Sequence, residues 1–536
     1  MTVLPASSVT SILCGILAVW LLSKVVEQRR RRTQTTSLAG PPNPSLVFGA
    51  SKLISDLVDA GDLYEEWSET YGSVYRVPAA FGMSKIVLCD PKAVLHFFSR
   101  ETVGYVHTTM MKNATENISG RGILWAEGET HKRHRKALSP AFSNAAIRRM
   151  TSVFYDSAYK LKSAWDSIIE ADLGAESAVI DVQRWMNYVS LDTIGIAGFS
   201  HDFGTLLGKP SAVAATFNDF ANLKPSLLGG AMQFVVGGVF PWVLKLPTDF
   251  RKLVDRLNAG MGEIAQELLE NSRKESEGEI KTEDKSIIGL LIKAEITDSE
   301  LHMSSDEVLA QMKVLMLAGY ETTSISLSWC LLELCKNPEV QQKLRQELSQ
   351  FGSTDPTWDQ LTNVLPYLDA VVHETLRLHL PLPESERVAA EDDILPLSFP
   401  LKTPGGDTVD SINIAKGEVV VVPKHMMNKS IRFWGSDAKE FKPERWLNET
   451  GIPERAQEIS GHRHLLTFSD GARLCLGRHF ALAEFKAVLS VIIRNYAFEF
   501  RDGPNTRTEI KRGILPRPCI AGEEGAKLPL RVHRLN

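Results

Sequence analysis

Residues 468–477 read F-S-D-G-A-R-L-C-L-G and are followed by an apolar helical pattern from Arg478 to about Asn495. The spacing of the apolar residues predicts a mostly buried helix rather than a strand. Cys475 is therefore expected at the N-terminal mouth of this helix, where unpaired N–H groups and the helix dipole lower the cost of a thiolate. Arg473 adds a permanent positive charge that can pair with a carboxylate.

The cysteine in this loop has a simpler alternative explanation. An isolated Cys before a helix is most often a small buried hydrophobic residue. An iron–sulfur or zinc site needs more ligands, but no second Cys is near and the nearest imidazoles belong to His462, His464 and His479. A thiolate in a tight loop beside a carboxylate-binding Arg instead suits a haem iron, because haem carries propionates.

The loop resembles the haem-binding loop of the cytochrome P-450 family at five positions: Phe468, Gly471, Arg473, Cys475 and Gly477. The resemblance implies that Cys475 is the axial ligand of the iron of haem b and that Phe468, Arg473 and Gly477 help to bind the cofactor. It also implies the cytochrome P-450 fold, which is mainly α with a smaller β-rich part. The haem would lie between a long distal helix and the helix that follows the Cys loop.

A long helix is predicted from the capping box at residues 304–307 to about Lys336, before Asn337-Pro338. Its interior contains A-G-Y-E-T-T at residues 318–323. A Gly costs about 1 kcal/mol inside a helix and adjacent Thr residues weaken it further, which indicates a functional reason. The alternative is a Gly that permits close helix packing, with Glu321 in solvent.

This segment resembles the oxygen-activation motif of the same family, with every fixed position matched. The match implies that Thr322 is the proton-relay hydroxyl and that Glu321 is its acidic neighbour, which connects it to solvent. Ala318 and Gly319 would leave room for dioxygen. The intact Glu–Thr pair disfavours a haem-thiolate isomerase or peroxygenase, since such relatives often lose it.

Glu374 and Arg377 share one helical face and can form an ion pair. The alternative is an ordinary surface pair worth about 0–1 kcal/mol. A zinc protease motif is disfavoured because Arg377 stands where H-E-x-x-H requires a second His. The segment resembles the E-x-x-R of the cytochrome P-450 family, whose third member matches Arg445. We assign these three residues to folding and to support of the haem loop.

A basic run at residues 131–136 places His131 and Arg135 on one helical face. Such a run is most often a solvated surface. It resembles the family's basic helix beside the haem, although His131 stands where Trp is common. Arg387 matches another propionate-binding position. The remaining basic residues of the run point elsewhere and offer charge to an acidic electron donor: Lys132, Arg133 and Lys136.

Residues 9–26 are nearly all apolar or small, and four Arg residues follow at positions 29–32. Basic residues after the apolar stretch predict a transmembrane signal anchor at residues 1–28 rather than a cleaved signal peptide. The alternative is an interfacial or core helix. Residues 29–45 are expected to form a basic, Pro-rich linker and residues 46–536 the catalytic domain. The positive-inside rule predicts a cytosolic domain on the endoplasmic reticulum membrane.

The spacing of apolar residues in the other segments predicts further strands and helices, and a segment without regular spacing is expected to be a loop. Strands are expected at residues 71–77 and 85–89, helices at 145–169, 181–198 and 249–272, and short strands after Phe498. Residues 101–124 lack a clear period and, by the family resemblance, form a loop over the substrate. By the same resemblance, the apolar, Gly-rich residues 214–246 form a mobile lid. The turn at residues 514–516 is expected to reach the pocket.

Composition and charge narrow the function further. A net charge of −5 over 536 residues disfavours nucleic-acid binding, and six scattered Cys residues without C-x-x-C indicate reduced thiols. No flavin or nicotinamide fingerprint is present, so the resemblance implies electrons from NADPH through a separate NADPH–cytochrome P-450 reductase, with cytochrome b5 as a further donor.

The resemblance predicts a membrane-anchored haem-thiolate monooxygenase that acts on a lipophilic small molecule. The P-E-R-W variant at residues 443–446 and the segment at residues 392–396 look like fungal members. A secondary metabolite such as a terpenoid is therefore the expected substrate. Fatty acids and xenobiotics are the alternatives within the family, and a non-catalytic haem-binding membrane protein is the alternative outside it.

Overall fold

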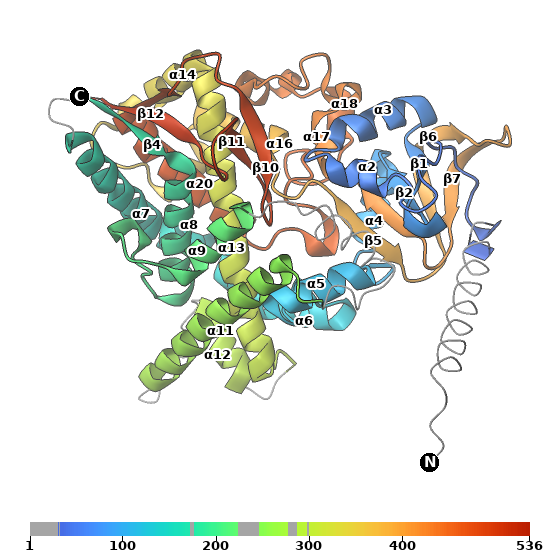
Figure 1. The fold of residues 1–536 in the computed structure, drawn as a ribbon, viewed down its shortest axis with the longest axis horizontal. Helices are drawn as coiled ribbons and strands as arrows, with labels where there is room; N and C mark the ends of the chain where they lie inside the picture. The colour runs from blue at the N-terminus through green and yellow to red at the C-terminus, as the bar shows by residue number, and fades with distance from the viewer. Residues whose placement is uncertain are drawn as a thin grey trace, which may run out of the picture.

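The computed structural model describes residues 30–31, 33–171, 176–222, 246–276, 287–296 and 300–535. Figure 1 shows a mainly helical part on one side and a smaller part on the other, where most of the strands gather. The helices of the first half are α2 (Ser51–Asp56), α3 (Gly61–Tyr71), α4 (Pro91–Ser99), α5 (Thr109–Ser119), α6 (Gly128–Leu138), α7 (Asn144–Glu170), α8 (Val182–Phe199), α9 (Ala212–Asn222) and α11 (Asp249–Ser276). Those of the second half are α12 (Ile287–Ile296), α13 (Ser305–Lys336), α14 (Pro338–Leu348), α15 (Trp358–Asn363), α16 (Pro366–Leu378), α17 (Lys424–Lys429), α18 (Ile431–Trp434), α19 (Glu454–Gln457) and α20 (Arg478–Asn495).

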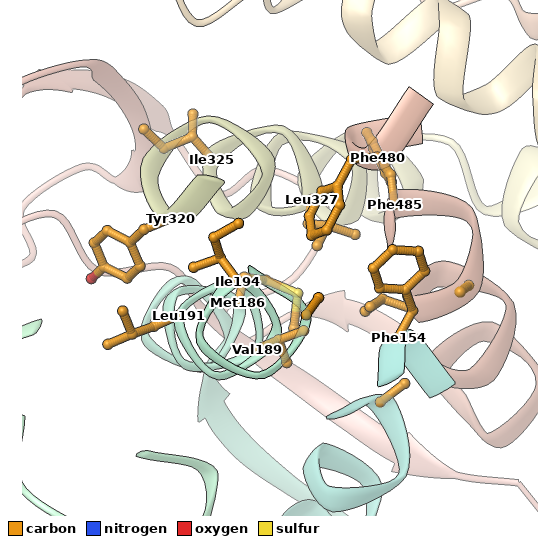
Figure 2. Close-up of a cluster of buried hydrophobic side chains, with 14 of the residues drawn as sticks. Phe154, Met186, Val189, Leu191, Ile194, Tyr320, Ile325, Leu327, Phe480 and Phe485 are labelled. Atoms are coloured by element: carbon orange, nitrogen blue, oxygen red, sulfur yellow. The ribbon is translucent and has the colours of Figure 1, made fainter. Parts of the chain in front are cut away.

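The long helix α13 organises the helical part. The Ser304 side chain accepts a hydrogen bond from the Glu307 amide, and the Glu307 carboxylate accepts one from the Ser304 amide. These two bonds confirm the predicted capping box. Apolar side chains surround most of α13 because it packs against α8, α11, α16 and α20. Figure 2 shows Ile194 of α8 next to α13, and the ring of Phe154 from α7 lies 5.0 Å from that of Phe480 on α20.

Four sheets are present in the described residues. The largest has the order β1-β2-β8-β5-β3, with an antiparallel β1–β2 hairpin and β8 parallel to β2. A second sheet is β4-β12-β9, and β6–β7 and β10–β11 are two-stranded. The strands are β1 (Val74–Pro78), β2 (Ser84–Leu88), β3 (Tyr105–Val106), β4 (Ser177–Asp181), β5 (Ser385–Ala389), β6 (Asp393–Lys402), β7 (Thr408–Ile414), β8 (Val419–Val422), β9 (Tyr496–Phe500), β10 (Thr508–Arg512), β11 (Pro516–Ile520) and β12 (Pro529–Arg534).

Several segments differ from the sequence-based expectation. The expected loop at residues 101–124 contains strand β3 and helix α5, whose N-cap Thr108 accepts a hydrogen bond from the Met111 amide. The prediction of a loop is wrong here, although none of the apolar side chains of α5 is fully buried. The hairpin begins at Val74 rather than residue 71, since Tyr71 still belongs to α3. Most of the expected lid lies in residues 223–245, outside the described residues.

The folded domain begins before residue 46. The Arg31 guanidinium donates to the Gly417 carbonyl at 2.8 Å, and the buried Thr35 donates to the Glu418 carboxylate at 3.1 Å. The Arg76 amide donates to the Ala39 carbonyl, so this part of the expected linker packs on the β-rich part. In the part of the chain that the structure describes, no helix is both long and apolar enough to span a bilayer. The segment at residues 9–26 lies outside that part.

Candidate active site

A backbone hydrogen bond across the loop before α20 and an essential glycine set the shape of this loop. The Cys475 amide donates to the Phe468 carbonyl at 2.8 Å, which closes the loop over the residues between them. Gly471 has φ +62°, and a Cβ atom there would lie 2.0 Å from the Phe98 carbonyl oxygen, so only Gly fits. A Cβ at Gly477 would meet only Phe142 at 3.8 Å, so no close approach to a protein atom requires a Gly there.

Cys475 differs from the other described cysteines. Its side chain is accessible, whereas those of Cys89, Cys330, Cys335 and Cys519 are buried. Although this side chain is accessible, it lies deep within the protein, and desolvation raises the pKa of the Cys475 thiol; four groups oppose this shift: the Gly477 amide, Arg135, Arg478 and Lys424. The amide at the helix N-terminus and the nearby cations favour the thiolate, but the effect of desolvation is larger. A bound metal ion would make the thiolate the stable form.

A cluster of cations gathers beside Cys475 from four separate elements. Arg135 of α6 donates to the Leu474 carbonyl at 2.7 Å, which ties it to the Cys loop. Arg473 donates to the Ala126 carbonyl and to Glu127, both at 2.6 Å. Arg387 of β5 lies 3.0 Å from Glu101, and its Nε atom, like that of Arg473, is buried without a hydrogen-bond partner among the described residues. These orphan donors point to an absent anionic group.

Lys424 completes the cluster, and no sequence motif marked it beforehand. It is buried at the start of α17 and donates to Ser469 at 3.2 Å. Burial lowers its pKa to about 8, and Glu101 opposes this shift. A Lys separated only by Pro423 from the four Val residues of β8 was the signal that could have found it, because the chain is still buried where such a strand ends.

The buried Glu101 and the partly buried Glu127 balance part of this charge. Although burial opposes ionisation, hydrogen bonding to His107 and the charge of Arg473 hold the pKa of Glu127 at about 2. Burial raises the pKa of Glu101, and Arg387 opposes the shift. Four cations thus lie with two carboxylates in this cluster, an excess of positive charge that suits the propionates of haem b. The donor set, together with the accessible Cys475 sulfur, fits this cofactor.

His131 lies on the same side of α6 as Arg135, as predicted, and is buried. Burial and the nearby charges of Arg473 and Arg135 lower its pKa to about 4. At neutral pH the His131 ring is therefore neutral, and it can offer a hydrogen bond to an anion but no charge.

The distal motif separates two side chains that are adjacent in sequence. The Thr322 hydroxyl is partly exposed and donates to the Ala318 carbonyl at 2.8 Å. Ala318 is exposed on the same side of α13. A Cβ at Gly319 would lie 2.7 Å from Ile194, so this Gly is needed for close packing against α8 rather than to leave room for dioxygen. Figure 2 shows Ile194 at this helix contact.

Glu321 is buried, which rules out the alternative in which its side chain lies in solvent. Its side chain is 2% exposed and forms an ion pair with Arg517 of β11, which is equally buried. Burial of both partners makes this contact part of the core. The sequence analysis did not identify Arg517, because nothing near Glu321 in the sequence reveals a partner on a distant strand.

The three residues assigned to folding meet in the core, as expected. Arg377 donates two hydrogen bonds of 2.8 Å to Glu374, and Arg445 donates a third of 2.9 Å. Trp446 and the Lys442 amide each donate to Glu374 at 3.0 Å. Arg377 also reaches three carbonyl groups of the segment before the Cys loop: those of Asn428, Ala438 and Glu440. The Glu374–Arg377 ion pair is therefore buried, and the alternative of an ordinary surface pair is wrong.

We expect Glu374→Gln to destabilise the protein by about 3–5 kcal/mol, because Arg377 and Arg445 would keep their charges in the core without a counter-charge. Glu444→Gln is a matched control, since Glu444 forms a partly exposed pair with Lys343 and should cost about 1 kcal/mol or less. Urea unfolding followed by circular dichroism measures both. Equal losses in the two variants would contradict the structural role of Glu374.

Glu484 on α20 is a buried acid that belongs to none of the sequence motifs described above. Both carboxyl oxygens are buried without a hydrogen-bond partner among the described residues that meets ordinary geometry. Its polar neighbours are the hydroxyls of Ser190 on α8 and Thr323 on α13. Burial raises the pKa of Glu484 well above its usual value, so the side chain is a neutral acid at neutral pH.

Glu484→Gln should become more stable than the wild type as pH rises. Above about pH 4.5 the unfolded chain releases the Glu484 proton while the folded chain retains it, so wild-type stability falls by up to about 1.4 kcal/mol per pH unit until the folded pKa is reached. Gln does not titrate and avoids this loss. Urea unfolding between pH 5 and 8 measures the difference.

Glu484→Ala provides the control for this prediction. Its cavity should lower stability at every pH. Its pH slope should nevertheless equal that of the Gln variant, because both substitutions remove the titrating group. A constant difference between Glu484→Gln and the wild type across this range would show that Glu484 is ionised in the folded protein.

Comparison with known proteins agrees with this site. Residues 39–519 match the family model of cytochrome P-450, and the chain belongs to this family. The cytochrome P-450 monooxygenases claQ and claP of Ampulloclitocybe clavipes are each 59% identical to it over 529 residues, which is 98% of either chain. Ganoderic acid synthetase of Ganoderma lucidum is 34% identical over 462 residues, 82% of this chain and 83% of that protein. The chain is therefore a monooxygenase that uses haem b.

Proposed function

We propose that this monooxygenase inserts one atom of dioxygen into a lipophilic secondary metabolite, such as a terpenoid. The observation that carries the proposal is an apolar cavity of about 300 Å³ between α2, α3 and the turn before β11. A cavity of this size lies at the lower end of the range for small-molecule sites. Its walls are mainly aliphatic and proline side chains: Leu57, Val58, Pro381, Leu382, Ile514, Leu515 and Pro516.

Two segments of the cavity wall continue along the chain into strands that carry residues described above. The segment at residues 381–384 precedes β5, which carries Arg387, and the turn at residues 514–516 leads into Arg517. This turn was expected at the pocket from the sequence. The polar residues at the wall are Ser55, Asp59, Tyr64, Glu384 and His425. This lining favours a largely apolar molecule that bears a few polar groups.

Different residues of the chain are assigned to binding haem, holding a proton and excluding water. Bound haem supplies the activation of dioxygen, with a Cys thiolate that donates electron density to the iron. Cys475 is the ligand we assign, and Arg135, Arg387, Arg473 and Lys424 would hold the propionates. The Thr322 hydroxyl holds a proton at Oγ1 on the accessible side of α13. Closely packed α8 and α13 keep bulk water from the inner side of the site.

We further infer that electrons come from a separate NADPH–cytochrome P-450 reductase, with cytochrome b5 as a further donor. Lys132 and Lys136 on α6 are well exposed and supply the basic surface for an acidic partner. Arg133 offers less positive charge to such a partner than the sequence suggested, because both of its terminal nitrogens donate to Glu307.

We also propose that residues 1–28 anchor the protein in the endoplasmic reticulum membrane with the catalytic domain in the cytosol. Four apolar side chains exposed soon after this segment support the proposal: Leu46, Val47, Leu53 and Leu57. The full chain should stay in the membrane pellet after carbonate extraction, and protease added outside sealed microsomes should digest the catalytic domain. Release by carbonate would contradict the anchor.

The function is tested by incubating the full chain with reductase, NADPH and a panel of terpenoids, fatty acids and aromatic xenobiotics. We expect NADPH-dependent hydroxylation of a terpenoid, with incorporation of one oxygen atom from labelled dioxygen. Turnover confined to fatty acids or xenobiotics would refute the proposed substrate class. Omission of reductase is the control, and undiminished turnover without it would refute the proposed electron donor.

A further inference from the structure

Two histidines that have no part in the candidate active site face each other. His373 lies on α16 and is buried, and His462 lies in the segment before the Cys loop and is partly buried. Their Nε2 atoms are 3.4 Å apart. This distance is longer than the usual range of protein hydrogen bonds, about 2.7–3.2 Å. A tetrahedral zinc ion with Zn–N bonds of about 2.0–2.1 Å holds its nitrogen ligands about 3.3–3.4 Å apart, which matches the observed distance.

The ring of His373 is already oriented by its other nitrogen. Nδ1 lies 2.8 Å from the Asp369 carbonyl oxygen and 3.3 Å from the carboxylate of the same residue. Because a carbonyl only accepts hydrogen bonds, Nδ1 must carry the hydrogen, and Nε2 of the neutral ring presents its lone pair toward His462. A metal-binding His almost always donates its other N–H to a carbonyl or carboxylate in this way.

The backbone that carries His462 has an uncommon conformation. Arg463 and His464 are consecutive residues with positive φ, +57° and +61°. Each such residue with a side chain costs free energy, and residues of this kind gather at ligand sites. A Cβ atom at Gly461 would lie 2.5 Å from the Leu465 carbonyl oxygen, so the turn is also tight. This strained turn holds His462 opposite α16.

The charges around the pair keep His462 available as a ligand. Burial, together with nearby charges that include Arg478, lowers the pKa of His462 to about 3, so its ring is neutral at pH 7. The same cations oppose a bound metal ion. Asp369 offsets part of this repulsion, because its carboxylate pairs with Arg463 and with Lys486.

We propose that His373 and His462 bind a divalent transition-metal ion of the kind that imidazole prefers, such as zinc. Among the residues that the structure describes, no group of three or more His, Cys, Asp or Glu side chains is placed to hold a metal ion, so water completes the coordination. The ion would join α16 to the segment that leads into the Cys loop, where the ring of Phe468 lies 6.1 Å from that of His462. The proposal does not depend on the substrate.

Equilibrium dialysis of the haem-loaded full chain against zinc at pH 7.5 tests the site. We expect one zinc ion per chain and at least about 10- to 100-fold weaker binding in His462→Gln, since loss of even an outer partner of a metal site has an effect of this size. His464→Asn is the matched control. His464 Nδ1 faces the Ile459 carbonyl instead, and Asn tolerates a positive φ, so this variant should bind zinc like the wild type. Equal affinity in His462→Gln and the wild type would overturn the proposal.

X-ray absorption at the zinc edge tests the ligands in the wild type, whether or not a variant folds. We expect two imidazole nitrogens at about 2.0–2.1 Å, with oxygen at the remaining positions. The iron of haem does not contribute at this edge. A sulfur ligand at about 2.3 Å would show that zinc binds a cysteine instead and would overturn the proposal.

Thermal unfolding tests whether the ion stabilises the fold. Zinc should raise the midpoint of the wild type and of His464→Asn, because it binds the folded chain, and should leave that of His462→Gln unchanged. Magnesium at the same concentration is the control and should have no effect, since it prefers oxygen ligands. The ferrous carbonyl spectrum verifies the haem site of each variant. An equal rise with zinc in all three proteins would place the ion elsewhere and would overturn the proposal.

Discussion

Replacing Cys475 with Ser is expected to abolish substrate oxidation and the long-wavelength carbonyl absorption of the reduced enzyme. That band is typical of ferrous haem with a thiolate ligand. A serine hydroxyl is far less acidic than a thiol, so it does not supply the electron density that oxygen activation requires. Arg135 and Lys424 would still attract the propionates, and we therefore expect haem to be retained at a reduced level.

Cys519→Ser is the matched control for this variant. Cys519 is buried in β11, where its thiol donates to the Glu509 carbonyl at 3.4 Å, and a hydroxyl can replace that contact. The control should keep both the carbonyl band and the activity. Retention of the band in Cys475→Ser, or its loss in Cys519→Ser, would contradict the assignment of the axial ligand.

Thr322→Ala is expected to lower the ratio of product to NADPH consumed by about 10²–10⁴-fold, the range for loss of a positioned proton-transfer group. The hydroxyl is the polar group that α13 presents beside the exposed Ala318. Ala has a higher helix propensity than Thr, so α13 should remain intact. Haem content and the carbonyl spectrum should therefore persist, while electrons are diverted into hydrogen peroxide.

Thr323→Ala is the neighbouring control and should have a milder effect on coupling. Its side chain is buried on the inner side of α13, where Glu484 is its polar neighbour. Product, NADPH and hydrogen peroxide are measured in parallel for both variants. Normal coupling in Thr322→Ala together with uncoupling in Thr323→Ala would show that the proton relay was assigned to the wrong Thr. Normal coupling in both variants would contradict a relay through either hydroxyl.

The local pattern of the sequence was sufficient for the long elements and for the ligand loop. The bounds of α13 and α20 were predicted closely because apolar spacing, a capping box and a following Pro act within a few residues. Cys475, Arg473, Glu374 and Arg377 could be recognised for the same reason, since their motifs are short and contiguous. Helix α5 was missed: it spans only 11 residues, and none of its apolar side chains is fully buried in the core.

The partners of those residues were decided by tertiary structure. Arg517 lies 196 positions from Glu321, and no local spacing indicates that a strand near the C-terminus neutralises the distal acid. Lys424, Glu101 and Glu127 enter the cation cluster because separate elements meet beside the Cys loop. Likewise, Gly319 owes its role to the approach of Ile194. Secondary structure follows from interactions within a few residues, whereas burial and charge pairing depend on which distant segments the folded core brings together.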